Sequence, residues 1–359
     1  MTWSLKLARI AGIDVFVHVT FLLLLGWIAM IHWADGRSVA SVVAGVGFIL
    51  ALFGCVVLHE FGHALTARRY GIRTRDITLL PIGGVARLER MPEDPKQELV
   101  VALAGPAVNV AIALLLMAWL LVSGDWQPID RLSVERGAFL ERVMMANVIL
   151  VAFNLLPAFP MDGGRALRAL LATRMEYTRA TERAAWIGQA MAVLFAFVGL
   201  LVNPFLIFIA LFVWIGAGQE ASMAQMKSAL AGIPVRRAML THFRTLTPSN
   251  TLGDAVDLIL TGSQQDFPVV VDGRVEGVLT RSDLMSALSR QGREELVTAA
   301  MQRDCLVAEP GEMLEAVLAR ARGRECQTVP ITEAGRLVGL VTTDNVGEFL
   351  MIQAAERGR

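Results

Sequence analysis

Two histidines and a glutamate have a spacing that suits metal-assisted hydrolysis. The run His59-Glu60-Phe61-Gly62-His63 lies inside a long apolar segment. Residues four apart share one face of a helix, so His59 and His63 can hold one metal ion, and neutral imidazole suits Zn²⁺. Glu60 lies beside them, placed to take a proton from an attacking water molecule. Buried structural histidines are the alternative, but these groups are costly to bury in a membrane without a function.

A catalytic zinc site needs a third protein ligand, and Asp162 is the best candidate. It follows an apolar run that is broken by Pro157 and Pro160 and closed by Gly163-Gly164. Such a segment cannot be plain helix, and irregular backbone at membrane depth is tolerated where it lines a cavity. An ordinary turn or helix-cap aspartate is the alternative.

The elements that position these residues are membrane helices. The chain has 359 residues, 55% of them hydrophobic and 18% charged, with a mean hydropathy of +0.53. This composition predicts a polytopic α-helical membrane protein. About six transmembrane helices are expected, at 13–33, 40–67, 97–122, 143–157, 186–201 and 204–218. The turn signal Asn203-Pro204 separates the last two, with a single helix over 186–218 as the alternative.

Loop charge predicts the orientation in the membrane. The segments 1–12, 68–96 and 157–185 carry fourteen Lys and Arg residues, whereas the alternate loops at 34–39, 123–142 and 202–203 carry four. By the positive-inside rule, the first set is cytoplasmic. Both termini are then cytoplasmic, and His59, His63 and Asp162 lie near the cytoplasmic side of the membrane. The zero net charge gives no indication of a nucleic-acid partner.

The C-terminal third is polar enough to be a soluble domain, and it contains an internal repeat of 62 residues without gaps. Helices are expected at 252–260 and 313–321. Two strands about a turn are expected at 267–279, with Asp272-Gly273, and again at 329–341, with Ala334-Gly335. Each copy then ends in a helix starting near Asp283 or Asn345. The three cysteines of the chain lack the number and spacing of a disulfide framework.

At its apolar part, the chain resembles the site-2 protease family of intramembrane metalloproteases. His59-Glu-Phe-Gly-His63 matches the family's H-E-x-x-H motif, and the segment from Asn154 to Pro160-Met-Asp162-Gly matches its N-x-x-P-x-x-P-x-D-G motif. The resemblance covers residues 1–220. It implies that His59, His63 and Asp162 are zinc ligands and that Glu60 is the base. It also implies that Asn154 and Pro160 position the substrate backbone.

Two further elements are similar to parts of that family. The segment 79–88 can form a membrane-associated hairpin whose edge holds an extended substrate by strand addition. A plain cytoplasmic turn is the alternative. Asn109 in the third apolar segment is interpreted as a residue that joins helices within the bundle, with a hydrogen bond near the site as the alternative.

The 62-residue repeat resembles a tandem pair of CBS domains, which are α/β modules. The similar runs are Gly277-Val-Leu-Thr280-Arg-Ser-Asp283 and Gly339-Leu-Val-Thr342-Thr-Asp-Asn345. The resemblance implies that ATP or another adenine nucleotide contacts Thr280, Asp283 and Thr342. Asn345 stands where the first copy has Asp283, which puts the second ribose contact in doubt. Purely structural or dimerising pairs are the alternative.

The expected organisation is a transmembrane metalloprotease domain at 1–220, a linker at 221–232 and CBS domains at 233–292 and 293–353. The expected activity is zinc-dependent cleavage, with one Zn²⁺ per chain, of a peptide bond in a transmembrane protein substrate. By family analogy, that substrate is a membrane-tethered regulatory protein. The CBS pair is expected to bind nucleotide and to support a homodimer. A CBS-regulated transporter or channel and an inactive membrane scaffold are the competing functions.

Overall fold

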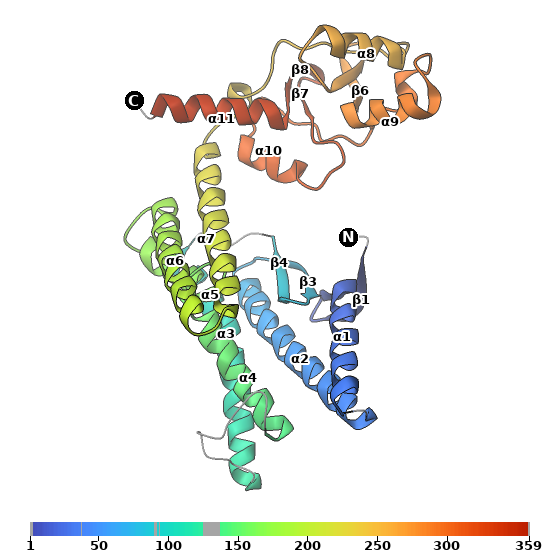
Figure 1. The fold of residues 1–359 in the computed structure, drawn as a ribbon. Coiled ribbons are helices and arrows are strands. Elements are labelled where there is room, and N and C mark those ends of the chain that lie inside the picture. Colours follow the sequence, from blue (N-terminus) through green and yellow to red (C-terminus); the bar gives the residue numbers. More distant parts are fainter. Residues whose placement is uncertain (1–2, 37, 90–91, 93, 125–136, 358–359) are drawn as a thin grey trace. The chain divides into compact units, whose positions relative to one another are not determined.

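The structure is a computed structural model that describes residues 3–36, 38–89, 92, 94–124 and 137–357. The chain forms two compact units, Met1–Ala224 and Gln225–Arg359, which are described separately below (Figure 1). Most of the predicted loop at 123–142 lies outside the described residues.

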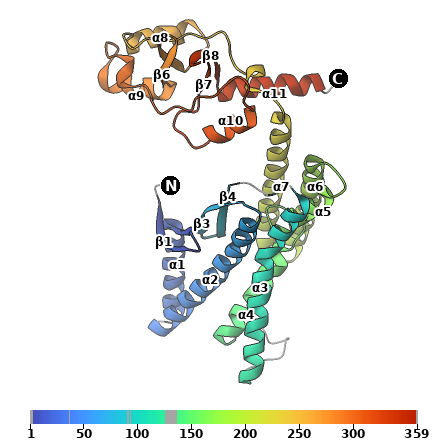
Figure 2. The ribbon, with the colours of Figure 1, turned by 180° about the vertical axis from the view of Figure 1, so that it is seen from behind.

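Helices dominate the first unit. In chain order they are α1 (Val19–Gly36), α2 (Val39–Arg69), α3 (Pro95–Ser123), α4 (Phe139–Asn154), α5 (Asp162–Ala172), α6 (Tyr177–Leu201) and most of α7 (Phe205–Leu230), whose residues after Ala224 belong to the second unit. Among the described residues, α2, α3, α6 and α7 are long and apolar enough to cross a membrane, and Val19–Ala34 of α1 is a shorter apolar helix. The helix α3 packs against both α2 and α4 (Figure 2). The prediction of a polytopic helical membrane protein is therefore confirmed.

The first predicted span was wrong at its start. Residues 13–18 form a strand, β2 (Ile13–His18), and the helix begins only at Val19. Ile13, Val15 and Val17 are buried in alternation with partly exposed residues, which is the period of a strand that has one face on the core. The turn before β2 contains Gly12 at a φ of 84°, a conformation that glycine adopts without strain.

A four-stranded sheet contains this strand and was not predicted as a whole. Its other members are β1 (Ser4–Ile10), β3 (Thr74–Leu80) and β4 (Gly83–Leu88). The order is β1-β2-β3-β4, with β2 and β3 parallel and the other pairs antiparallel. The predicted hairpin at 79–88 is thus part of a β3–β4 hairpin that begins at residue 74, with β4 at the edge of the sheet. Ile77 and Phe61 share a small buried core, which fixes the sheet on the C-terminal half of α2.

Two predicted breaks between helices are confirmed. The helix α4 ends at Asn154 and α5 begins at Asp162, so the proline-rich segment between them is irregular. The helices α6 and α7 are separate, and Asn203 Oδ1 accepts a hydrogen bond from the Phe205 N–H at 2.9 Å. The alternative of one helix over 186–218 is therefore wrong.

The second unit repeats one arrangement twice, as the sequence predicted. The first copy holds η2 (Val235–Arg237), α8 (Leu252–Thr261), β5 (Phe267–Val271), β6 (Arg274–Leu279) and α9 (Arg281–Gln291). The second holds η3 (Val297–Ala299), α10 (Leu314–Ala321), β7 (Val329–Glu333), β8 (Arg336–Val341) and α11 (Thr343–Arg357). The last helix of each copy begins two residues earlier than expected.

The repeat extends to the two hydrophobic cores. Leu252, Phe267 and Leu279 are buried in the first core, and the residues 62 positions later occupy the second. Asp272 and Ala334 have φ values of 49° and 51° and are each followed by a glycine, so the two hairpin turns also match. Cys305 and Cys326 form a disulfide bond, which the cysteine count did not predict.

Candidate active site

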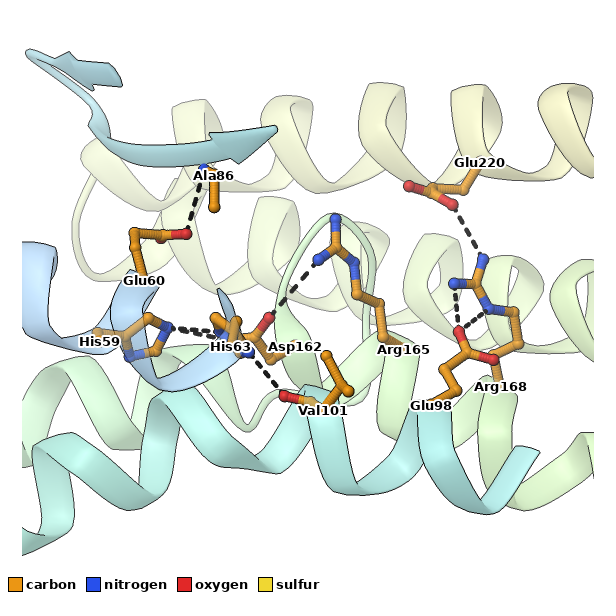
Figure 3. A network of polar contacts seen from close by, with 10 residues as sticks. All are labelled: His59, Glu60, His63, Ala86, Glu98, Val101, Asp162, Arg165, Arg168 and Glu220. Atoms are coloured by element: carbon orange, nitrogen blue, oxygen red, sulfur yellow. Dashed lines mark hydrogen bonds and ion pairs between the residues drawn. The ribbon is translucent and has the colours of Figure 1, made fainter. Parts of the chain in front are cut away.

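The two histidines and the aspartate meet inside the first unit. His59 and His63 lie one turn apart on α2, and their Nε2 atoms are 3.1 Å from each other. Asp162 Oδ2 lies 3.1 Å from each of these nitrogens, although about 100 residues separate it from them in the chain (Figure 3). All three side chains are buried, and their three ligand atoms form a group that can hold a metal ion.

Hydrogen bonds at the far side of each ring favour a cation at this point. The Nδ1 atom of His63 lies 2.7 Å from the Val101 carbonyl oxygen, and that of His59 lies 2.7 Å from Asn109 Oδ1. Both partners are acceptors, so each Nδ1 carries the ring proton and each neutral Nε2 presents a lone pair. Two lone pairs and a carboxylate oxygen that converge in a buried space fit Zn²⁺.

Asn109 belongs to this arrangement. The alternative prediction for this residue, a hydrogen bond near the site, is confirmed. Its side chain is fully buried, and its Nδ2 donates to Asn147 Oδ1 on α4 at 2.9 Å. That bond fixes the amide so that Oδ1 faces His59. Asn109 therefore does more than join helices, because it also sets the tautomer of a candidate ligand.

A glycine on α3 leaves the space for the ligand atoms. A Cβ atom at Gly105 would lie 2.2 Å from His63 Nε2 and 2.6 Å from His59 Nε2. A Cβ atom at Gly62 would lie 2.7 Å from the Ala104 carbonyl oxygen, so α2 and α3 also touch through this glycine. Small residues near the histidines thus allow α3 to lie close to α2.

Glu60 faces the edge of the sheet. Its Oε2 accepts a hydrogen bond from the Ala86 N–H of β4 at 3.2 Å (Figure 3). A Cβ atom at Gly84 would lie 2.9 Å from Glu60 Cγ, so this glycine lets the strand lie directly against the carboxylate. Glu60, the residue next to His59, therefore lies against the edge strand of the sheet.

Asp162 is held by the irregular segment that precedes it. It occupies the first turn of α5, and Gly163 and Gly164 follow. A Cβ atom at Gly163 would lie 2.3 Å from the Leu156 carbonyl oxygen, and one at Gly164 would lie 2.5 Å from the Ala158 carbonyl carbon. Only glycine fits here, so these two residues let α5 start tightly against the loop.

Asn154 and Pro160, the other two candidate residues of the motif that contains Asp162, contact α4 and α7. The Asn154 amide donates to the Leu150 carbonyl oxygen of its own helix at 3.0 Å. Pro160 lies against α7, where a Cβ atom at Gly216 would be 2.6 Å from its Cδ. Their role in substrate positioning stays a prediction.

The candidate nucleotide residues of the second unit lie at helix starts. Thr280 Oγ1 accepts from the Asp283 N–H at 3.2 Å and donates to Asp283 Oδ2 at 2.5 Å, so the pair caps α9. Thr342 Oγ1 accepts from the Asn345 N–H in the same way, and Asn345 Nδ2 donates to the Ala238 carbonyl oxygen at 2.6 Å. Thr280 also lines a cavity of about 470 Å³, together with Asp266, Arg281, Ser282, Met285, Glu325 and Gln327.

Fold and site together define a class of protein. Two histidines on a helix of membrane-spanning length, joined by an aspartate from α5 and with a glutamate beside them, form the site of a metal-dependent hydrolase embedded in a membrane domain.

Comparisons with known proteins agree with this class. The sequence profile of Peptidase family M50 matches residues 47–132 and 130–198, and that of the CBS domain matches 235–290 and 295–351. The zinc metalloprotease MJ0392 of Methanocaldococcus jannaschii is 33% identical over 347 residues, 96% of each chain. Stage IV sporulation protein FB of Bacillus subtilis is 32% identical over 162 residues, 43% of this chain and 53% of its own. Among solved structures, a site-2 protease from M. jannaschii is 38% identical with a TM-score of 0.45, covering 61% of this chain and 95% of that one.

The chain belongs to Peptidase family M50, the site-2 proteases, and carries a C-terminal CBS pair. It is a zinc metalloendopeptidase with membrane-spanning helices, as its sequence predicted. The competing function of a CBS-regulated transporter or channel is therefore wrong.

Proposed function

We propose that this metalloprotease cleaves a peptide bond within or next to a transmembrane segment of a membrane-tethered regulatory protein. The observation that carries the proposal is the convergence of His59, His63 and Asp162 within 3.1 Å of one another, with both histidines on the apolar helix α2. A site buried among membrane helices is reached by a substrate that is itself in the membrane. Loop charge supports a site near the cytoplasmic side, with both termini in the cytoplasm.

Each polar residue of the site has a part in the reaction. His59, His63 and Asp162 would hold one zinc ion, which when bound supplies a Lewis acid able to lower the pKa of water to about 7. Glu60 would take the proton from the attacking water and later pass it to the leaving amine. Asn154 and Pro160, on the segment that leads to Asp162, would position the substrate backbone.

The edge of β4 supplies a place for an unwound substrate. An α-helical substrate hides its carbonyl groups in its own hydrogen bonds and must be extended before cleavage. In β4, the Ala86 N–H points away from β3 and toward Glu60. A substrate strand paired with this edge would accept a hydrogen bond from Ala86 and lie beside the base. Binding would then free Glu60 from the strand at the moment when it is needed.

Replacing Ala86 with proline tests the role of this edge, because proline removes the N–H group and is tolerated on an edge strand. The matched control is Ala86→Ser, which keeps the N–H group. We expect Ala86→Pro to leave a single-span substrate uncut while zinc remains bound, and Ala86→Ser to cleave it normally. Normal cleavage by a folded Ala86→Pro variant would remove strand addition from the mechanism.

For the second unit, we propose that an adenine nucleotide such as ATP binds at the CBS pair and regulates cleavage. The cavity beside Thr280 has a volume within the range of small-molecule sites. In the first copy, Thr280 is paired with Asp283. Thr342 and Asn345 occupy the corresponding positions in the second copy. The pair would also support a homodimer. Calorimetric titration with ATP compares the wild type with Thr280→Val, and equal binding by both would remove Thr280 from the site.

The main test is cleavage of a panel of single-span substrates by purified protein in detergent, with Glu60→Gln as the comparison. The substitution keeps the volume of the side chain and removes its basicity. We expect the variant to retain about one zinc per chain and to lose cleavage. A wild-type protein that folds and binds no zinc would contradict the proposal. Cleavage that survives in Glu60→Gln would remove Glu60 as the base and would leave the metal site in place.

A further inference from the structure

A fully buried arginine lies beyond the ligands on the helix that carries Asp162. Arg168 is 3% exposed and lies on α5, six residues after Asp162. Its Nε and Nη2 atoms donate to Glu98 Oε1 on α3 at 2.8 and 2.5 Å, and its Nη1 donates to Glu220 Oε2 on α7 at 3.0 Å (Figure 3). One guanidinium group therefore joins three helices.

The same guanidinium also lies on aromatic rings. Its central carbon is 5.1 Å from the ring centroid of Phe159 and 5.0 Å from that of Tyr177. Phe159 is completely buried and stands three residues before Asp162. Arg168, on the helix after Asp162, thus contacts the loop before this candidate ligand through Phe159 and the start of α6 (Tyr177–Leu201) through Tyr177.

The partners of Arg168 lie one helical turn from groups that shape the site. Glu98 lies three residues before Val101, and the carbonyl oxygen of Val101 is hydrogen-bonded to the His63 ring. Glu220 follows Gly216, which packs against Pro160, by four residues. Residues three or four apart on a helix lie on the same face. Arg168 therefore fixes one turn of α3, one turn of α7 and both sides of Asp162 relative to one another.

Stability alone is a weak reason for such a cluster. A buried ion pair commonly contributes little, because the cost of removing both charges from water offsets their attraction. Its geometry is nevertheless specific, since the planar guanidinium presents several donors at fixed angles and lysine cannot serve two carboxylates in the same way. A ligand that must meet two histidine nitrogens at short range needs such fixed geometry.

Resting on the proposed function, we propose that Arg168 is a positioning residue of the metalloprotease. Through Glu98, Glu220 and Phe159, it holds Asp162 at the point where His59 and His63 converge. Loss of either carboxylate arm would let α5 shift and would loosen the hold on zinc, while the substrate-binding surface at β4 would remain as it is.

The test compares Arg168→Lys and Glu220→Gln with wild type in the full-length protein. Glu220→Gln removes one of the two carboxylates and leaves Arg168 paired with Glu98. Arg168→Lys keeps the positive charge but removes the planar guanidinium group. The control is Arg174→Lys, a matched substitution at an exposed position just after α5. Zinc release to a chelator, thermal unfolding, and kcat and KM on a single-span substrate are measured for each protein.

We expect both variants to unfold near the wild-type temperature, to release zinc roughly tenfold faster and to lose roughly tenfold in kcat with KM little changed. The control should match the wild type. If folded Arg168→Lys and Glu220→Gln released zinc at the wild-type rate, the proposal would be overturned and Arg168 would have only a structural role. Wild-type protein that holds zinc but cleaves nothing would count against the proposed function only, because zinc release still decides the role of Arg168.

Discussion

Substitution of Gly105 by alanine adds one methyl group at the most crowded point of the site. The added Cβ atom would lie 2.2 Å from His63 Nε2 and 2.6 Å from His59 Nε2. Favourable contacts between heavy atoms lie at about 3.5–4.0 Å. Either the histidine rings or the backbone of α3 must therefore move by about 1 Å or more.

Such a shift is large compared with the tolerance of a metal site. Ligand nitrogens bind zinc at about 2.0–2.1 Å, so a displaced ring no longer reaches the ion. A misplacement of about 1 Å can cost on the order of a hundredfold in rate. We expect Gly105→Ala to fold, to retain well under one zinc per chain after dialysis, and to lose cleavage by about that factor.

The assay measures zinc content, thermal unfolding and cleavage of one single-span substrate side by side. The control is Gly54→Ala on α2, where a Cβ atom would have no neighbour within 4 Å among the described residues. We expect this control to behave as wild type. Retention of zinc and activity by folded Gly105→Ala would refute the reasoning, since it would mean that the ligand atoms do not lie where α3 limits them.

Three other results are expected. Asn109→Ala should weaken zinc binding by about 10–100-fold in a chelator competition, because the histidine that it contacts loses its acceptor; unchanged affinity would show that this hydrogen bond does not orient the ring. Gly84→Val should abolish cleavage with zinc retained, because the new side chain meets Glu60; cleavage at the wild-type rate would place the strand elsewhere during turnover. Hydrogen bonds to its carboxylate, of which the one from the Asn250 side chain has the largest effect, lower the pKa of Asp254 below its usual 3.8. The stability that this carboxylate contributes is therefore present above pH 3.8 and lost as the pH falls through the lowered value. In the Asp254→Asn variant of the full chain, the thermal unfolding temperature should fall less as the pH is lowered through this range. An unchanged pH dependence of the unfolding temperature would assign the loss of stability to other groups.

The sequence was most informative where chemistry depends on local spacing. The histidines of α2 lie one turn apart, and that geometry follows from helical periodicity alone. The 62-residue repeat predicted the elements of the second unit because each copy must bury the same face. Helix breaks at Pro157 and Asn203-Pro204 were also predictable, since proline and turn residues act on the backbone locally.

The predictions were incomplete where a strand or side chain acts through distant partners. Strands β1 and β2 were missed because the apolar alternation of β2 continues directly into the apolar helix α1. The role of Asn109 was underestimated, because nothing along the chain tells whether an amide in a membrane helix faces another helix or a ligand ring. Arg168 was not singled out at all, since its partners Glu98 and Glu220 are 70 and 52 residues away.

By itself, the sequence determined the residue types of the candidate metal ligands, the spacing of the two histidines on α2, the membrane character of the first unit and the duplicated second unit. All of these follow from periodicity and composition. Only the tertiary structure decided that Asp162 meets His59 and His63, that Gly105 leaves room for them, and that Glu60 faces β4. The physical reason is that these contacts join segments far apart in the chain, and their distances are set by how closely helices pack rather than by any local preference.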